Sequence, residues 1–361
     1  MRILVISNCR PGSGWGTYSN NLFEALHEFS SIRFINLFGS TSLKECTNVP
    51  LYEPSFLGIN VNRIFGLQSE VFGRAFPRIY FNSLIKQIKH QRHEGLLLHF
   101  SYNLLPVITY EKEDIATIHD VIFTRKQFEF QKIERAYSNL LLKRYLKFKN
   151  IIVDSNYVRR ELISLGFEGD IEVIYPPLGR GFFPIPDKRM IRDWLGLPQG
   201  KILILSVGNN KPWKNLVNVF KTVDQLGNDY CLVRVGSRIK NEIAFNNLSI
   251  EKLNLVFNAS DVLLFPSLEE GFGFPLIEAF GSSLPAVVSD IEVFREVGKE
   301  AAIFIDPLDV RSIKKGIFEA LSGREDLIER GFKRALDFNI DNFRCRMIEY
   351  YNKLSNWPRL I

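Results

Sequence analysis

The sequence predicts an α/β protein with two doubly wound parallel sheets. Three observations support this fold class. Short apolar runs alternate along the chain with longer amphipathic stretches, which is the order of strands and helices in a helix-covered parallel sheet. The short runs are apolar throughout, as strands buried on both faces are. A proline-rich break interrupts the rhythm once, and the rhythm then restarts. We therefore expect two Rossmann-like halves that face a ligand cleft at the carboxyl ends of their strands.

Length and composition agree with this class. At about 150 residues per domain, 361 residues suggest two domains. Hydrophobic residues make up 46% and charged residues 24%, which excludes a disordered, collagen-like or coiled-coil chain. The longest wholly apolar stretches fall far short of the about 20 residues of a membrane-spanning helix. The N-terminus lacks the basic start and cleavage site of a signal peptide, so we expect a cytoplasmic protein.

Charge and cysteine usage narrow the expected partners. The 46 Lys and Arg residues exceed the 40 Asp and Glu residues, and the net charge of +6 suits anionic small molecules or the anionic face of a membrane. No zinc-finger spacing or RNA-binding aromatic motif occurs, and we expect no nucleic-acid partner. The four cysteines form no CxxC pair, so free thiols are expected in place of a zinc site or a disulfide framework.

The first half holds six expected strands and ends at a break. Apolar residues at helical spacing predict helices over Tyr18–Phe29 and Glu134–Phe148. The segment Tyr175–Pro186 carries four prolines and two glycines in twelve residues, which cannot continue a helix or a central strand. We place the domain boundary there, with residues 1–180 in the first domain and 181–341 in the second. The expected strands are Ile3–Ser7, Ile32–Asn36, Leu96–Phe100, Ile115–Ile118, Ile151–Asp154 and Ile171–Ile174.

The second half repeats the rhythm and ends in a helix, Asn342–Leu354, with apolar residues on one face. Its expected strands are Lys201–Val207, Tyr230–Val235, Val262–Phe265, Pro285–Val288 and Ala301–Ile305. Its other expected helices are Asn215–Gln225, Ile250–Asn258, Pro275–Gly281, Val310–Leu321 and Asp326–Leu336.

The strongest functional signal lies between a strand that ends at Phe265 and a helix that begins near Pro275. The turn between them places the amides of Gly271, Phe272 and Gly273 at the positive end of the helix, which suits a diphosphate. Two carboxylates eight residues apart, Glu270 and Glu278, are good acceptors for sugar hydroxyls. The alternative is that Glu270 caps the helix and that Glu278 is a solvated helix residue.

This stretch resembles the E-x7-E motif of retaining glycosyltransferases of the GT-B fold, specifically glycosyltransferase family 4. The flanking segments Ala259–Ser267, Pro285–Asp290 and Glu296–Pro307 continue the resemblance. It implies that Glu270 contacts hydroxyls of the donor sugar and that Glu278 holds the ribose hydroxyls of the nucleotide. It also implies that the amides of Phe272 and Gly273 meet the phosphates, with Gly271 and Phe274 beside them in the donor site.

A second strand-to-helix loop, Ser206–Leu216, holds candidate cations for the departing nucleoside diphosphate. The family places an arginine soon after the glycine of this loop and a lysine before the helix. Lys214 matches the lysine, whereas Asn209 stands at the arginine position. Lys211 is the candidate to replace the missing cation, and weaker stabilisation of the leaving group is the alternative. Without the resemblance, Lys214 would be taken as a surface lysine.

Two further loops in the first half resemble the family. His119 comes directly after the strand Ile115–Ile118, where the family carries a His-Asp pair, and the resemblance implies that its side chain touches the donor sugar. A structural histidine is the alternative. The loop after the first strand contains Gly14 and Gly16, which the resemblance places beside the donor diphosphate and the acceptor. Its spacing is not G-x-G-x-x-G and no acidic residue follows on the next strand, which disfavours dinucleotide binding.

Two weaker signals concern the nucleobase and a membrane. The segment Ile243–Ser249, together with Glu251 and Leu253, resembles the part that cups the base, which makes Asn247 and Leu248 donor-binding candidates. A helix that is usual in the family before this segment is shortened or lost. Apolar and basic residues alternate over Phe81–His93, and Lys143–Lys149 is also basic. These segments fit either a solvated helix face or a surface for anionic lipid or a lipid-diphosphate acceptor.

We therefore predict a two-domain GT-B glycosyltransferase. The first domain would bind a glycan or lipid-linked saccharide acceptor, and the second a GDP- or UDP-linked sugar as donor. The resemblance implies retention at the anomeric carbon, no metal, no cofactor beyond the donor, and a last segment (342–361) that crosses back to the first domain. No DxD motif stands in the expected site to hold a cation. The alternatives are a catalytically silent GT-B subunit that binds a sugar nucleotide or a partner, and a sugar-nucleotide epimerase of the same fold.

Overall fold

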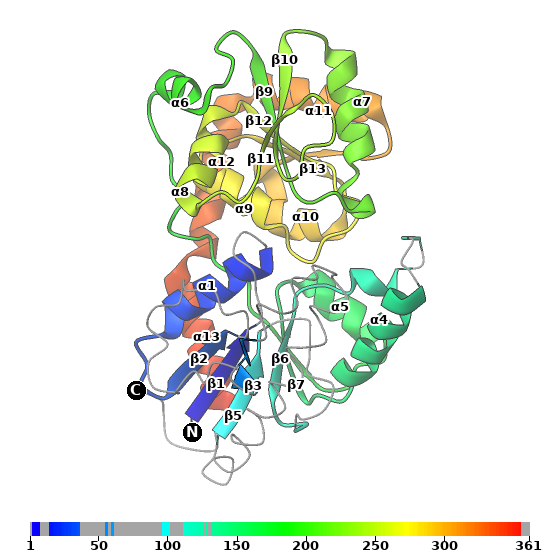
Figure 1. Ribbon diagram of the computed structural model, residues 1–361, viewed down its shortest axis with the longest axis vertical. Helices are drawn as coiled ribbons and strands as arrows, with labels where there is room; N and C mark the ends of the chain where they lie inside the picture. Colours follow the sequence, from blue (N-terminus) through cyan, green and yellow to red (C-terminus); the bar gives the residue numbers. More distant parts are fainter. Residues whose placement is uncertain are drawn as a thin grey trace.

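Two parallel sheets of six strands each organise the chain, one above the other in Figure 1. The computed structural model describes residues 2–7, 14–36, 55–56, 59–60, 96–101, 111–125, 127–128 and 132–354. The expected basic helix Phe81–His93, the first residues of the glycine-rich loop (8–13) and the last seven residues (355–361) lie outside these ranges. Among the described residues, no helix is both long and apolar enough to span a bilayer.

The first sheet has the strand order β2-β1-β5-β6-β7-β8 with every pairing parallel. One face of the sheet packs on α1, and the other face packs on α4 and α5. A separate antiparallel pair joins β3 to β4. The elements are β1 (Arg2–Ser7), α1 (Gly14–Leu26), β2 (Ile32–Asn36), β3 (Ser55–Phe56), β4 (Ile59–Asn60), β5 (Leu96–Phe100), β6 (Ile115–Ile118), η1 (Ile122–Thr124), α4 (Lys132–Tyr145), β7 (Asn150–Val153), α5 (Asn156–Ser164) and β8 (Asp170–Val173).

The second sheet has the order β11-β10-β9-β12-β13-β14, again parallel throughout, with helices on both faces. No helix or strand forms between β8 and α6, the segment that contains the proline-rich break. The elements are α6 (Lys188–Leu195), β9 (Ile202–Val207), η2 (Pro212–Lys214), α7 (Leu216–Leu226), β10 (Tyr230–Val235), β11 (Ile243–Phe245), α8 (Ile250–Ala259), β12 (Val262–Phe265), α9 (Phe274–Gly281), β13 (Ala286–Ser289), α10 (Glu292–Gly298), η3 (Lys299–Ala301), β14 (Ile303–Ile305), α11 (Val310–Ser322), α12 (Arg324–Ala335) and η4 (Leu336–Phe338).

Most expected elements are present with ends shifted by a few residues, and the structure adds several short ones, among them β3, β4, α5, α6, β11 and α10. β11, α6 and α10 are each eight residues or shorter, so periodicity signals them weakly. The signal for α6 lay in its caps instead. The Asp187 side chain accepts a hydrogen bond from the Met190 amide, and Gly196 ends the helix at φ +66°. Between β10 and β11 the described chain forms no helix, as the short spacing after Gly236 predicted.

The last helix, α13 (Ile340–Leu354), crosses back onto the first sheet, as predicted, and packs against α1. Its apolar face, with Phe343, Met347 and Tyr351, joins the core cluster beneath α1. The Arg344 guanidinium donates to the Ala25 carbonyl at 2.7 Å. The two parts of the chain are therefore tied together by the C-terminal helix as well as by the segment after β8 (Figure 1).

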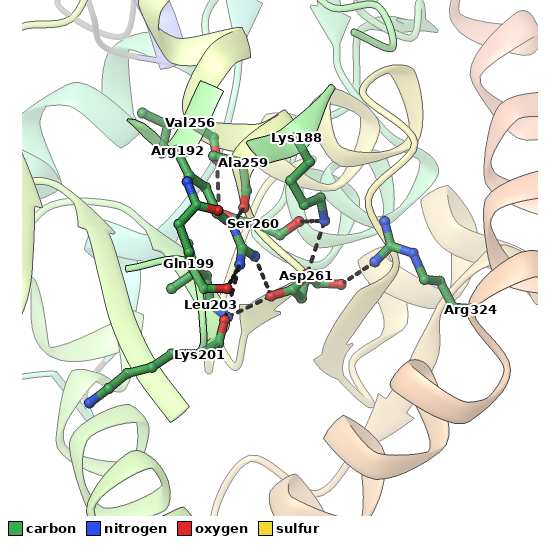
Figure 2. Close-up of polar contacts among 10 residues, drawn as sticks. All are labelled: Lys188, Arg192, Gln199, Lys201, Leu203, Val256, Ala259, Ser260, Asp261 and Arg324. Atoms are coloured by element: carbon green, nitrogen blue, oxygen red, sulfur yellow. Dashed lines mark hydrogen bonds and ion pairs between the residues drawn. The ribbon is translucent and has the colours of Figure 1, made fainter. Parts of the chain in front are cut away.

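At the amino end of the second sheet, charged groups close the C-terminus of α8 (Figure 2). The carbonyls of Ala259 and Ser260 accept hydrogen bonds from Arg192 and Lys188 at 2.9 and 2.6 Å. Asp261 accepts from the same two cations at 2.6 and 3.0 Å. Although burial opposes ionisation, these cations hold the pKa of Asp261 below its ordinary value. Cations at a helix C-terminus oppose its negative end, so this cluster has a structural role at the edge away from the expected site.

Candidate active site

The second sheet reverses its strand order between β9 and β12, because later strands are added outward on both sides of this pair. In open parallel sheets ligands bind at the carboxyl edge beside such a reversal. The loop after β9 carries Lys214, and the loop after β12 carries Glu270. Topology alone therefore places two of the three predicted catalytic residues, Lys214 and Glu270, at the same point; the third, His119, lies in the other sheet's part of the chain.

Lys214 and Glu270 form an ion pair in which Nζ lies 2.5 Å from Oε1. Their side chains are only 16% and 12% exposed, so water screens this pair little. The Lys214 stem lies against Gly208, where a Cβ would come within 3.3 Å of it, and Gly208 has φ +145°. Glycine at this position therefore leaves room for the lysine and provides a backbone conformation that other residues rarely adopt.

Backbone contacts hold the two loops together. The Leu268 amide donates to the Trp213 carbonyl at 2.7 Å. Asn215, in a left-handed conformation between η2 and α7, donates from Nδ2 to the carbonyls of Pro266 and Pro307 at 3.1 and 2.7 Å. These bonds come from the residues on both sides of Lys214 and hold the segment just before Glu270, so they fix the approach of the two side chains.

The N-terminus of α9 follows Glu270 within four residues. Gly273 caps the helix at φ +99°, and a Cβ there would come within 2.7 Å of the Phe294 ring. Phe272 is buried and packs edge-on against the Phe274 ring at 5.6 Å. The segment 271–274 thus brings the positive end of a helix next to the Lys214–Glu270 pair, an arrangement that favours an anion.

Glu278 lies in the second turn of α9 and is 5% exposed. Burial raises the pKa of its carboxyl to about 8. The side chain is therefore protonated at neutral pH in this structure. Hydrogen bonds donated by a ligand's hydroxyl groups would favour the ionised form of Glu278. They would replace the hydrogen bonds that water donates to an exposed carboxylate. The prediction that Glu278 is a solvated helix residue is excluded by its burial.

His119 lies at the carboxyl end of β6 and is buried. Its Nδ1 is 2.6 Å from Asp154 Oδ2, and its Nε2 is 3.2 Å from the Ser101 carbonyl. Both partners are acceptors, so only the protonated imidazolium satisfies both contacts. Burial lowers the pKa of His119, but the Asp154 charge and these hydrogen bonds outweigh it and raise the pKa above its ordinary value. The predicted contact of its ring with a donor sugar stays a prediction.

The His119 backbone contacts the second part of the chain. A Cβ built at Gly271 would lie 1.8 Å from the His119 carbonyl oxygen, so the two backbones touch. Next in sequence, burial together with the carboxylates of Glu270 and Asp154 raises the pKa of Asp120 to about 6. The loops that carry His119 and Glu270 therefore meet, although they come from different sheets.

The other predicted donor-site residues follow the carboxyl ends of β1, β9 and β11. Gly14 is the first residue of α1 and Gly16 is buried in its first turn, at the edge where β1 ends. Asn209 and Lys211 are exposed in the loop after β9, with Lys211 Nζ 5.9 Å from the Trp213 ring. Asn247, at φ +51°, and the half-buried Leu248 follow β11, which is two strands, roughly 10 Å, away from β9.

Sequence reasoning missed a buried arginine beneath the Asn209 loop. Arg234, in β10, is fully buried and donates to the carbonyls of Gly208 and Ser237, each at 3.0 Å. It also donates to Asn210 Oδ1 at 3.2 Å and lies 3.5 Å from Glu242 Oε1. The sequence did contain a sign of this residue, because Arg234 is the one charged residue in the otherwise largely apolar strand Tyr230–Val235. Asp154 was missed too, although it follows β7 at the same edge at which His119 follows β6.

Within the described ranges, no group of three or more His, Cys, Asp or Glu side chains is gathered as a metal site would require.

The chain is similar to known glycosyltransferases. Residues 187–334 match the sequence profile of the family described as "Glycosyl transferases group 1". The chain is 24% identical over 265 residues to the O-antigen chain mannosyltransferase RfbU of Salmonella typhimurium (strain LT2). The matched region covers 68% of this chain and 70% of that protein.

Two solved structures have the same overall arrangement. Sucrose-phosphate synthase from Thermosynechococcus elongatus matches with a TM-score of 0.75 and 18% identity over 98% of this chain and 99% of that one. Anabaena Alr3699/HepE, solved in complex with UDP and glucose, matches with a TM-score of 0.73 and 13% identity over 98% and 100% of the two chains. These neighbours are GT-B glycosyltransferases, and the chain has the GT-B fold that the sequence predicted. Together, the profile, the relative and the fold support a glycosyltransferase.

Proposed function

We propose that this chain is a retaining, metal-independent glycosyltransferase of family 4. It transfers a hexosyl group, mannose first among the candidates, from a GDP- or UDP-linked donor to a glycan or lipid-linked saccharide. The observation that carries the proposal is the contact between Lys214 and Glu270 beside the N-terminus of α9. A mannosyltransferase of O-antigen chains among its relatives supports the choice of sugar and acceptor class.

The donor lies along the carboxyl edge of the second sheet. Its diphosphate meets Lys214 and the amides of Phe272 and Gly273, because both the cation and the helix end oppose its charge. The ribose hydroxyls donate to the buried Glu278. The base lies toward Asn247 and Leu248, two strands further along the same edge.

The two members of the ion pair separate when the donor binds. Lys214 turns to the phosphate, and Glu270 accepts a hydroxyl of the donor sugar. The bond from C1 to the phosphate oxygen then breaks while a bond from C1 to the acceptor oxygen forms on the same face of the sugar. The acceptor proton passes to the departing phosphate oxygen. The rate gain comes from fixed charges aimed at the leaving group in a poorly solvated site.

The acceptor binds on the side of the first sheet, where His119 meets the Glu270 loop. The enzyme works in the cytoplasm, at the inner face of the membrane when its acceptor is lipid-linked. Exposed Lys143 and Lys147, in and just after the last turn of α4, support this placement because basic groups are attracted to anionic lipid.

A catalytically silent subunit is the second candidate, and one observation favours it. Asn209 stands exposed where the resembled family has an arginine. Such a protein would bind a nucleoside diphosphate without turning a donor over.

Turnover of the donor separates the two candidates. We would measure release of GDP from GDP-mannose and of UDP from UDP-glucose, in EDTA, with wild type and Glu270→Gln. The proposal predicts release by the wild type that EDTA does not reduce and that the variant lacks, while Glu325→Gln, at an exposed position in the first turn of α12, behaves as wild type. Binding of GDP or UDP without release would favour the silent subunit.

A further inference from the structure

Glu270 has a neighbour on each side that is held by the opposite part of the chain. Before it, Glu269 is nearly buried, and its Oε1 accepts hydrogen bonds from Arg125 Nε and Nη2 at 3.3 and 3.0 Å. The Tyr157 hydroxyl donates to the same oxygen. Arg125 follows η1 and Tyr157 lies in the first turn of α5, both in the first sheet's part of the chain.

After Glu270, the Gly271 carbonyl accepts a hydrogen bond from Ser155 Oγ at 2.6 Å. The Gly271 backbone also touches the His119 carbonyl. Ser155 caps α5 and His119 follows β6, so these contacts too come from the first sheet's part. The loop that presents Glu270 is thus held from both sides across the boundary between the sheets.

The cluster around Glu269 is internally connected. Arg125 Nη2 donates to the Tyr157 hydroxyl at 2.6 Å and pairs with Glu161 one turn further along α5. Burial and the Glu269 charge raise the pKa of Tyr157, so its hydroxyl remains a donor at physiological pH. Each donor therefore faces an acceptor, and removal of one donor leaves the nearly buried Glu269 oxygen with less support.

A second carboxylate docks α5 against the second part of the chain. Glu296 of α10 accepts from the amides of Asn156 and Tyr157 at 2.6 and 3.0 Å, at the N-terminus of α5. Figure 1 shows α5 and α10 facing each other across the boundary. This docking brings Tyr157 to Glu269 and keeps it there.

We infer that Arg125 and Tyr157 are positioning residues for the proposed transfer: by holding Glu269, they fix Glu270 in its place against the donor sugar. The inference rests on the proposed function. It predicts a division of labour, because the groups proposed to hold the phosphates and the ribose, which are Lys214, the amides of Phe272 and Gly273, and Glu278, lie in the second part of the chain. Binding of the nucleotide then depends mainly on that part, to which the predicted loop of Gly14 and Gly16 adds from the first, whereas turnover needs the contacts from both parts that hold Glu270.

The test is Tyr157→Phe, which removes one hydroxyl and leaves the ring. The matched control is Arg160→Gln, because the exposed Arg160–Glu292 ion pair also joins α5 to α10 but lies away from the loop. We would measure the Kd of GDP and UDP by calorimetry, kcat and KM for hydrolysis of GDP-mannose and UDP-glucose, and Tm. Loss of a hydrogen bond to a charged group predicts a kcat lower by roughly ten- to a hundredfold in Tyr157→Phe and a Tm lower by about a few degrees, with Kd close to that of wild type. The control keeps all of these values.

Glu269→Gln provides an independent variant in case the first one disturbs folding. It should lower kcat in the same way, and Tyr157→Phe should add little to it, since both act on one contact. An unchanged kcat in both variants overturns the inference, and so does a nucleotide affinity that falls in step with kcat. A wild type that neither binds a nucleoside diphosphate nor hydrolyses a donor refutes the proposed function itself.

Discussion

Glu278→Gln should make the protein more stable at alkaline pH, although it removes a residue of the proposed donor site. The carboxyl is 5% exposed, and burial raises its pKa from 4.5 to about 8. At pH values between these two pKa values, the Glu278 carboxyl binds a proton in the folded state but not in the unfolded state. Stability therefore falls as the pH rises through this window, and it stops falling above pH 8. The amide of glutamine is neutral at every pH and avoids the loss.

The size of the effect follows from the shift. At 1.36 kcal/mol per pKa unit, the change from 4.5 to about 8 corresponds to at most about 5 kcal/mol. For a protein of this length, a gain of this size in the free energy of unfolding raises Tm by on the order of 10 °C at pH 9. At pH 4 the carboxyl is protonated in both states, and the difference between variant and wild type should be at its smallest.

The assay is thermal and urea unfolding of wild type and Glu278→Gln, followed by circular dichroism at intervals from pH 4 to pH 9. Glu300→Gln, at an exposed position in η3, is the control and should show no pH-dependent gain. A constant stability difference across this range, or a variant that is less stable at pH 9, would refute the argument that burial sets the ionisation of Glu278.

The same carboxyl links nucleotide binding to pH. If ribose hydroxyls donate to Glu278, binding favours its ionised form and lowers its pKa below about 8. Binding of GDP or UDP at pH 7 should then release a proton, and affinity should rise as the pH approaches 8. Calorimetric titration in two buffers with different heats of ionisation measures that proton. Equal observed enthalpies in the two buffers would mean that no proton is released and would contradict the link.

Three further changes probe the site and its support. Lys214→Ala should lower kcat for donor hydrolysis by about 10²–10³-fold because it removes the cation that faces the leaving group, and an unaltered kcat would exclude that role. Gly271→Ala places a Cβ on the His119 carbonyl, so we expect small-angle scattering to show a more open molecule and turnover to be at least tenfold slower. An unchanged scattering profile with normal turnover would count against the contact between the Gly271 and His119 backbones. Arg234→Met leaves the buried Glu242 without its ion-pair partner and should cost about 3–5 kcal/mol in urea unfolding, whereas Arg234→Met combined with Glu242→Gln should recover part of that loss.

The fold could be predicted from the sequence because its strands carry a strong signal. Runs such as Val262–Phe265 are wholly apolar and buried on both faces, and their spacing along the chain fits helices between them. Short elements carry less of this signal. The three-residue strand β11 and the seven-residue helix α10 are held by their neighbours more than by their own periodicity.

The candidate site was predictable in part for a similar reason. Lys214 and Glu270 each follow a strand, and parallel neighbours bring their carboxyl ends together, as β9 and β12 do. No such rule pairs residues across two sheets. The contacts of Glu269 with Arg125 and Tyr157 span 144 and 112 positions and depend on how the two parts of the chain meet. Local patterns in a sequence do not contain that information.

The central claim is that the second part of the chain binds a nucleoside diphosphate beside Lys214 and the N-terminus of α9. The most direct test is calorimetric titration of the purified protein with UDP and then GDP, using Glu278→Ala as the control. The account predicts saturable binding of one nucleotide by the wild type and its loss in the variant. Binding of neither nucleotide, or equal binding by the variant, would contradict it.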